Sequence, residues 1–378
     1  MREHLCNPKN QRIVIKIGSH VLTSKGKFTP DRLKQLAEQM MVLTKAGNEV
    51  LLITSGAVLM GKSMLDLQLN YYPRSLKQAL AAIGQVDLIS EYKNIFSRLD
   101  QPIGQILINL DDFQRRRRYL NIKETILGLL KLGILPILNE NDTIYTEDMS
   151  FGDNDNLAAQ VAGMLDADLL VILSTVDGLY DGDPLDSGSR LIPEVPSITD
   201  RMIKDTRSKG QLLSTGGMRA KLEAIRKTNH VGIPAVLASG KTPNVLLQLF
   251  NGKPVGTLFN ADAKRMSLKK RWIAYSSGTE GKIIIDEGAV RAITVNKSSL
   301  LSSGVTGIEG FFDAQVPVII STERDQDIAR GITNYGSQDL NAIVGLSAEE
   351  IFETLGSNYF NEVVHREQMV ILPTLEGA

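Results

Sequence analysis

Residues 49–57 read Glu-Val-Leu-Leu-Ile-Thr-Ser-Gly-Ala. The apolar run from Val50 to Ile53 is typical of a strand that is buried on both faces, as in a parallel sheet covered by helices. The Ser55-Gly56-Ala57 that follows indicates a tight turn from the strand into a helix. We therefore expect an α/β fold in which the polar functional residues lie where such strands end.

The same alternation of strand and helix continues along the chain on both sides of this stretch. Residues 12–17 are rich in isoleucine and valine and end at Gly18, and Thr29-Pro30-Asp31 has the N-cap, first-turn proline and acid of a helix start. Further strands are expected at 103–110, 134–139, 168–173 and 234–238, and helices at 74–98, 119–132, 154–165 and 218–230. This order predicts one open, mostly parallel sheet with helices on both faces, in which ligands bind beyond the carboxyl ends of the strands.

The character of the sequence changes near residue 260. A basic run at 264–271 reads as a linker, and glycines then separate short apolar segments that are typical of strands. We expect a small β-rich, barrel-like module after the α/β domain. The expected division is an α/β domain over 1–262, a linker over 263–275, the β-rich module over 276–362 and a tail over 363–378.

Composition excludes several classes of protein. The formal net charge of -1 argues against a globally basic nucleic-acid binder. A single cysteine, Cys6, excludes a disulfide framework within the chain and fits a cytoplasmic location, and four scattered histidines do not form a zinc motif. We expect no signal peptide and no membrane span, because the first residues are polar and no run reaches the ~20 apolar residues that a span needs.

Two lysine-and-glycine segments are candidates for phosphate binding. Lys16 lies near the end of a buried strand, where its charge is costly unless an anion meets it, and Gly18 lets backbone N–H groups approach a phosphate. A strand-end lysine that reaches solvent is the alternative. Thr215-Gly216-Gly217 precedes a helix that carries Lys221, and a helix N-terminus attracts anions. A plain loop-to-helix junction is the alternative there, and neither segment is a Walker A loop.

Acids and amides concentrate in two clusters, at Asn139–Asp142 and Gly152–Asn156. Asp and Asn favour turns and caps, and they also hold the ammonium group of a small zwitterion. Substrate binding and helix capping both stay open for Asp153 and Asp155. Ser55 lacks the glycine of a nucleophile elbow, because Ile53 stands at that position, so we interpret Ser55 as a substrate contact.

Taken in order, six motifs resemble the glutamate 5-kinases of the amino-acid-kinase superfamily. The resemblance runs from about residue 11 to 360 and includes a C-terminal module that is similar to a PUA domain. The motifs are Val-Ile-Lys-Ile-Gly-Ser at 14–19, Thr-Ser-Gly-Ala at 54–57, Asn-Glu-Asn-Asp at 139–142, Gly-Asp-Asn-Asp-Asn at 152–156, Asp-Gly-Leu-Tyr at 177–180 and Thr-Gly-Gly-Met-Arg-Ala-Lys at 215–221.

The resemblance implies an activity and a set of site residues. ATP would phosphorylate the side-chain carboxylate of L-glutamate, with Mg²⁺ as a second cofactor, in the first step of proline synthesis. Lys16 and Lys221 would be the catalytic lysines, and Ser55, Asp142 and Asn154 would contact glutamate. The ATP contacts would be Lys16, Ser174, Thr175, Thr215, Gly216, Gly217, Met218, Arg219, Ala220 and Lys221.

The resemblance also implies partners. L-Proline would be a feedback inhibitor, the chain would form a dimer or tetramer, and the product would pass to glutamyl-phosphate reductase. One alternative is a superfamily kinase for another anion, such as N-acetylglutamate, aspartate, carbamate or a nucleoside monophosphate. The acid-rich clusters argue against a phosphate acceptor because they would repel it. The other alternative, an RNA-binding protein led by the C-terminal module, is disfavoured because 280–360 shows no basic stripe.

Overall fold

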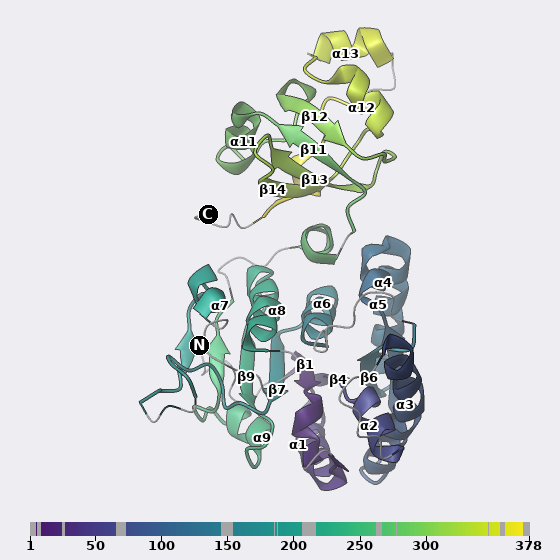
Figure 1. Ribbon diagram of the computed structural model, residues 1–378, viewed down its shortest axis with the longest axis vertical. Coiled ribbons are helices and arrows are strands. Elements are labelled where there is room, and N and C mark those ends of the chain that lie inside the picture. The colour runs from purple at the N-terminus through teal and green to yellow at the C-terminus, as the bar shows by residue number, and fades with distance from the viewer. Residues whose placement is uncertain are drawn as a thin grey trace. The chain divides into compact units, whose positions relative to one another are not determined.

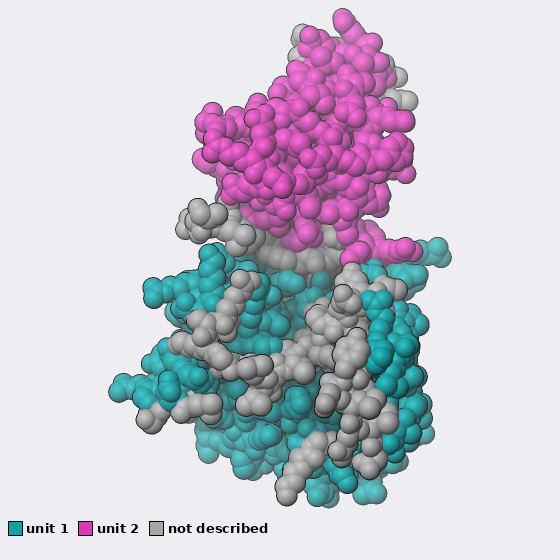
Figure 2. Space-filling view, in the orientation of Figure 1, with its two compact units in different colours: residues 1–112, 117–265 teal, residues 113–116, 266–378 magenta. Residues whose placement is uncertain are grey.

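The computed structural model describes residues 5, 9–24, 27–65, 73–144, 154–184, 186, 188–205, 217–261, 267–276, 278–346, 348–355 and 360–372. Its helices and strands are drawn in Figure 1. The chain forms two compact units, coloured separately in Figure 2. Unit 1 comprises residues 1–112 and 117–265, and unit 2 comprises residues 113–116 and 266–378.

Unit 1 is built on an eight-stranded sheet. Its strands, in spatial order, are β5 (Ile103–Ile108), β6 (Leu135–Glu140), β4 (Glu49–Ile53), β1 (Arg12–Ile17), β7 (Leu169–Ser174), β9 (Ala235–Ser239), β10 (Thr257–Phe259) and β8 (Glu194–Val195). Only the β9–β10 pair in this sheet is antiparallel. The prediction of a mostly parallel sheet is therefore confirmed. A short hairpin of β2 (Thr23–Ser24) and β3 (Lys27–Phe28) follows β1.

Helices cover both faces of this sheet (Figure 1). Helices α6 and α8 pack against each other on one face, and α1 packs with α3 and α9 on the other. The helices of unit 1 are α1 (Pro30–Lys45), α2 (Ala57–Met64), α3 (Arg74–Ser97), α6 (Asn154–Leu165), α7 (Asp200–Asp205), α8 (Met218–His230) and α9 (Val245–Phe250). Helices α4 (Leu110–Gln114) and α5 (Arg116–Lys131) belong to it as well, except for their residues within 113–116.

The central strand β1 shows how the sequence selects these layers. Successive side chains of a strand point to opposite faces. Ile13, Ile15 and Ile17 join the apolar cluster that also contains residues of α1, α3 and α9. Val14 and Lys16 therefore point to the opposite face, where α6 contacts β1.

One expected strand is shorter than the sequence pattern indicated. The strand expected at 103–110 ends at Ile108, because Leu110 already begins α4. The backbone N–H of Asn109 donates a hydrogen bond of 2.9 Å to the Asp112 carboxylate, as in one half of a capping box. The apolar side chain of Leu110 continued the strand pattern, but the bond between Asn109 and Asp112, three residues apart, favours a helix start instead.

Unit 2 contains its own five-stranded sheet and its own apolar core. The strands, in spatial order, are β12 (Val305–Glu309), β11 (Gly281–Ile285), β13 (Pro317–Thr322), β14 (Asp327–Ile332) and β15 (Met369–Ile371). Its helices are α10 (Leu268–Arg271), which continues into a π-helical turn at Trp272–Ser276, α11 (Glu287–Thr294), α12 (Ser337–Ile343) and α13 (Ala348–Leu355). The prediction of a second, β-rich module is confirmed. Helix α10 lies within the expected linker at 263–275, and β15 lies within the expected tail at 363–378.

The arginine run at 115–118 has defined contacts. The guanidinium of Arg116 lies 5.0 Å from the centre of the Trp272 ring, and the Trp272 indole N–H donates to the carbonyl of Phe113 at 3.1 Å. Arg118 forms a 2.7 Å ion pair with Asp112. Arg116 and Arg118 therefore each contact another side chain of the protein.

Candidate active site

The polar segments selected from the sequence meet at the carboxyl edge of the unit 1 sheet. The hydroxyl of Ser55, just after β4, donates to the carbonyl of Ile17 at the end of β1, at 3.1 Å. The N–H of Gly18 donates to the carbonyl of Leu173 in β7, at 3.0 Å. The ends of three adjacent strands are thereby joined, which brings the candidate substrate and phosphate residues to one place.

A buried triad of two lysines and one aspartate lies beside these strand ends. The Lys16 ammonium is 2.7 Å from Oδ1 of Asp155, and the Lys221 ammonium is 3.1 Å from Oδ2 of the same residue. The three residues come from β1, α8 and α6, and they are 5%, 6% and 1% exposed, respectively. We call Lys16, Asp155 and Lys221 the lysine triad. The structure therefore brings the two predicted lysines together through a residue that the sequence left unassigned.

Burial and charge act against each other in the lysine triad. Burial alone would raise the pKa of Asp155, but the two lysines outweigh burial and lower it, so the carboxylate stays ionised. Burial lowers the pKa of Lys221, Asp155 opposes that shift, and the charge of Lys16 adds to it. Two ammonium groups thus meet at one buried carboxylate. Ammonium groups gathered in this way attract an anion beside them.

A second polar cluster lies at the end of β6. Nδ2 of Asn154 donates to Oδ1 of Asn139 at 3.2 Å, and Nδ2 of Asn139 donates to Oε1 of Gln85 at 2.7 Å. Oδ1 of Asn154 is buried and has no hydrogen-bond partner among the described residues. Asp142 follows on the same segment, and burial raises its pKa to about 6. The predicted residues Asp142 and Asn154 thus flank β6 at its carboxyl end, and Gln85 is an addition that the sequence did not suggest.

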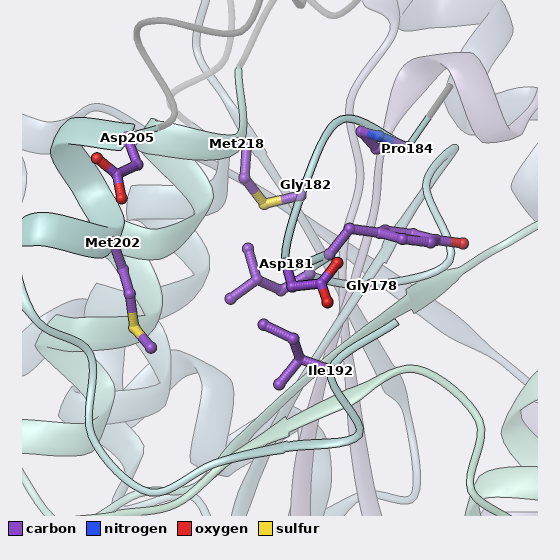
Figure 3. A pocket seen from close by; sticks show the side chains of 10 residues that line it. Gly178, Asp181, Gly182, Pro184, Ile192, Met202, Asp205 and Met218 are labelled. Atoms are coloured by element: carbon purple, nitrogen blue, oxygen red, sulfur yellow. The ribbon is translucent and has the colours of Figure 1, made fainter. Parts of the chain in front are cut away.

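A pocket of about 180 Å³ lies in unit 1, next to the start of α8. Figure 3 shows Met218, Ile192 and Met202 around it, with Asp181 and Gly182 from the loop after β7. The sequence analysis singled out residues 177–180 of this loop as a family motif without assigning them a contact. Its apolar lining of leucine, isoleucine, methionine and tyrosine suits a flat aromatic group.

Comparison with known proteins gives the family. A model described as the amino acid kinase family matches residues 11–239, and one described as the PUA domain matches residues 281–355. A glutamate 5-kinase of Thermoanaerobacter sp. (strain X514) is 41% identical over 365 residues, which cover 96% of this chain and 98% of that protein. This chain belongs to the glutamate 5-kinase family. The resemblance inferred from the six motifs is thereby confirmed.

Other members of the glutamate 5-kinase family are similarly close. The enzyme named glutamate 5-kinase in Syntrophus aciditrophicus (strain SB) is 39% identical over 363 residues, which cover 96% of this chain and 94% of that protein.

Among solved structures, a UMP kinase from Bacillus anthracis is similar over part of the chain. It is 17% identical, with a TM-score of 0.46, and the match covers 68% of this chain and 98% of that one.

The described residues that the resemblance assigned to ATP lie mainly at the end of β7 and at the start of α8. Ser174 is buried at the end of β7, where its carbonyl accepts the N–H of Gly240 at 2.8 Å, and Thr175 follows it in the loop. Gly217 precedes α8, which carries Met218 in the pocket wall and Lys221 in the lysine triad. The remaining residues are Ala220, which is half-buried, Arg219, whose side chain pairs with Glu223 at 2.7 Å, and Thr215 and Gly216, which lie outside the described residues.

The two acids of the cluster at residues 152–156, Asp153 and Asp155, have different outcomes. Asp153 lies outside the described residues, so its choice between capping and binding stays a prediction. Both carboxylate oxygens of Asp155 contact lysines, an interaction that neither of the two alternatives included. No sequence signal separated Asp155 from its neighbours, although two lysines predicted to meet one phosphate could have suggested a shared counter-ion.

Proposed function

We propose that this member of the glutamate 5-kinase family transfers the terminal phosphoryl group of ATP to the side-chain carboxylate of L-glutamate. The product is L-glutamyl 5-phosphate, made in the first step of proline biosynthesis. The lysine triad is the observation that supports this best. Its two ammonium groups lie at the edge where three strand ends meet, and a transferred phosphoryl group carries its charge on oxygens that such groups can meet.

The amino acid would be held by its ammonium group. Asp142 offers a carboxylate, and Asn154 offers a buried amide oxygen without a partner in the described part of the chain. Both groups accept hydrogen bonds, as an ammonium requires. Ser55 would add a hydroxyl contact from the end of β4. These contacts would leave the side-chain carboxylate of glutamate directed toward the lysine triad.

The chemistry needs no general base. A glutamate side chain has a pKa of ~4.3, so its carboxylate is already a nucleophile at neutral pH. The obstacle is repulsion between this carboxylate and the polyphosphate. Lys16 and Lys221 would lower it with charges that Asp155 fixes in position before the reaction begins.

The nucleotide would lie along the start of α8. Its base would enter the pocket lined by Leu179, Ile192 and Met218, and its phosphates would meet the helix N-terminus and Lys221. Ser174 at the end of β7 and Thr175 in the loop after it would add contacts with the nucleotide. A nucleotide would therefore connect the apolar pocket to the lysine triad.

Mg²⁺ would accompany the nucleotide. Within the described ranges, no group of three or more His, Cys, Asp or Glu side chains could hold a metal ion, and both oxygens of Asp155 face lysines. This donor set fits an ion held chiefly by phosphates and water, as is usual for Mg²⁺ at kinase sites. When bound, the ion would neutralise phosphate charge.

We also propose a cytoplasmic homo-oligomer that L-proline inhibits and that hands its product to glutamyl-phosphate reductase. Membership of the family supports these proposals. No helix in the described part of the chain has the length and apolar character to cross a membrane. Exposed apolar side chains on the edge strand β5 and on α3 and α5 would suit a contact between subunits, namely Leu107, Val86 and Leu120. Light scattering behind a sizing column measures the oligomeric state.

Substitution of the lysines tests the proposed reaction. Lys16→Ala and Lys221→Ala should each lower the rate of glutamyl phosphate formation by a factor of ~100 or more, because each removes a charge aimed at the transferred group. Lys227→Ala is the control, since Lys227 lies further along α8 and contacts Asn156 at 2.7 Å. Circular dichroism checks folding. Wild-type rates in either triad variant would contradict the proposal.

A further inference from the structure

The amides of Gln85, Asn139 and Asn154 form a continuous chain of hydrogen bonds from α3 to the start of α6. The two bonds are 2.7 Å and 3.2 Å long, and each joins an amide nitrogen to the oxygen of the next amide. Asn139, in the middle, is only 1% exposed. We call these three residues the amide relay.

An amide has a donor end and an acceptor end, so a relay has a direction. Oε1 of Gln85 accepts from Asn139, which turns the oxygen of Asn139 toward Asn154. That oxygen accepts from Nδ2 of Asn154, which leaves Oδ1 of Asn154 as the end of the relay. This terminal oxygen is buried and has no partner in the described part of the chain. The relay therefore presents an acceptor.

An acceptor at this place discriminates between ligand groups. An oxygen attracts an ammonium group and repels a carboxylate or phosphate oxygen. A relay that ran in the opposite direction would present the NH₂ group of Asn154 and would favour an anion. We infer that Gln85 is a positioning residue that sets the relay's direction and so makes the site selective for a substrate with an unmodified α-amino group. The inference rests on the proposed function, because it assumes that Asn154 meets the ammonium of glutamate.

The packing of α3 fixes Gln85 in place. Gly84, the preceding residue, lies against α2 so closely that a Cβ there would be 1.9 Å from the carbonyl oxygen of Ala57. Two turns after Gln85, the hydroxyl of Tyr92 lies 2.8 Å from Oγ1 of Thr54, inside the core. The helix is thus tied to the β4 turn on both sides of Gln85. A side chain anchored in this way can orient Asn139 with little loss of conformational freedom.

Three substitutions distinguish the hydrogen-bond direction of the amide relay from the mere presence of a side chain at position 85. Gln85→Glu keeps the shape and can only accept, so it preserves the direction of the relay. Gln85→Met keeps the approximate length and removes the acceptor, and Gln85→Asn keeps an amide but shortens the reach by one methylene. Gln105→Met, at an exposed position of β5, is the control for the same change elsewhere.

The experiment measures kcat and KM for glutamate and for ATP in the full chain. It also measures the inhibition constant of glutarate, which is glutamate without the amino group. We expect Gln85→Met and Gln85→Asn to raise the glutamate KM roughly tenfold, with kcat and the ATP KM unchanged. Gln85→Glu should stay within about threefold of wild type. The glutarate constant should change less than about twofold in all variants, because no ammonium is present to be recognised.

Other outcomes would overturn the inference. Wild-type glutamate KM in Gln85→Met and Gln85→Asn would show that the relay does not act on the substrate. Equal losses for glutamate, glutarate and ATP in all three variants, Gln85→Glu included, would show that Gln85 only supports the fold. Failure of the proposed function looks different, since the wild-type protein would then form no glutamyl phosphate at all.

Discussion

A single carboxylate, that of Asp155, decides the geometry of the candidate active site at the scale of residues. It is buried between two lysines that are far from it in the sequence, Lys221 lying 66 positions away. A pair of buried ammonium groups without a counter-ion would repel each other and lose their hydration. Asp155 therefore serves both the stability of the ligand-free protein and the positions of the two lysines.

Removing this charge should be costly in both respects. We predict that Asp155→Asn lowers the free energy of unfolding by about 3–5 kcal/mol, because it leaves buried ammonium groups uncompensated. It should also lower kcat by a factor of ~100 or more, since the lysines lose their positions. Urea titration and a coupled ATPase assay measure the two effects.

A surface ion pair provides the comparison. Glu49 pairs with Arg12 at 2.6 Å and is 45% exposed, so Glu49→Gln should change stability by less than about 1 kcal/mol. Equal effects of the two substitutions on stability would contradict the description of the lysine triad as a buried, charged cluster.

The carboxyl of Asp142 predicts a pH dependence. Burial raises its pKa to about 6, and only the ionised form pairs with an ammonium. Between pH 7.5 and pH 5.5, kcat/KM for glutamate should therefore fall about fourfold through this group. The pH dependence of kcat/KM reports the titration of Asp142 in the enzyme without glutamate. The value of kcat at saturating glutamate should therefore change less.

The same shift predicts the sign of a stability effect. A carboxyl whose pKa is raised by folding contributes stability at low pH, and this contribution is lost as the pH rises through about 6. Asp142→Asn should therefore stabilise the ligand-free protein at pH 7.5 and have little effect near pH 4. Thermal melts at the two pH values measure this, with Asp111→Asn at the exposed start of α4 as control. A variant less stable than wild type at pH 7.5 would contradict a raised pKa at this half-buried position.

At the scale of elements, the site depends on how closely α3 approaches α2. Gly61 and Gly84 allow the two helices to touch along their backbones, since a Cβ at either position would lie 2.1 Å or less from a carbonyl oxygen. This contact holds the Ser55-Gly56-Ala57 turn against α3. The turn carries a candidate substrate contact, so the packing of the two helices positions part of the site.

Two glycine substitutions distinguish packing from helix propensity. Gly84→Ala should lower the free energy of unfolding by about 1–3 kcal/mol and raise the glutamate KM, because the helices must separate. Gly128→Ala, in α5, has nothing within 4 Å of the new methyl group and should stabilise the protein by about 0.5–1 kcal/mol. Urea titration of both variants measures this, and equal signs would contradict the close crossing.

The elements themselves could be predicted well because their signals are local. The apolar runs that became β1 and β4, and the helix start at Pro30, are legible within a few residues. The site was predictable only in part. Gln85 lies 54 positions from Asn139, in a helix whose composition gives no sign of a role, and Asp155 looks like its neighbours in a row of acids and amides. Contacts that depend on helix packing leave no local pattern.

At the scale of the whole molecule, the chain has two units with separate apolar cores. The candidate site lies entirely within unit 1, and the chain's single tryptophan, Trp272, is buried in unit 2. Ligands should therefore act on the stability of one unit, while tryptophan fluorescence reports on the other.

We predict two thermal transitions with different responses to ligand. Glutamate together with a non-hydrolysable ATP analogue should raise the midpoint of the unit 1 transition, because ligands that bind only the folded state stabilise it. The midpoint followed by Trp272 fluorescence should not move. Calorimetry and fluorescence on the same samples measure both, and a single midpoint that shifts equally by both methods would show that the two units unfold as one.

The most direct test of the central claim is the identity of the acceptor. Phosphorus NMR and hydroxylamine trapping should show an acyl phosphate on the side chain of L-glutamate when the protein is given ATP and Mg²⁺. N-Acetylglutamate, aspartate and UMP, tested in the same way, should give at most a few per cent of that rate. Phosphorylation of any of these at a rate above that of glutamate would contradict the proposed function and the role of the acidic and amide residues around it.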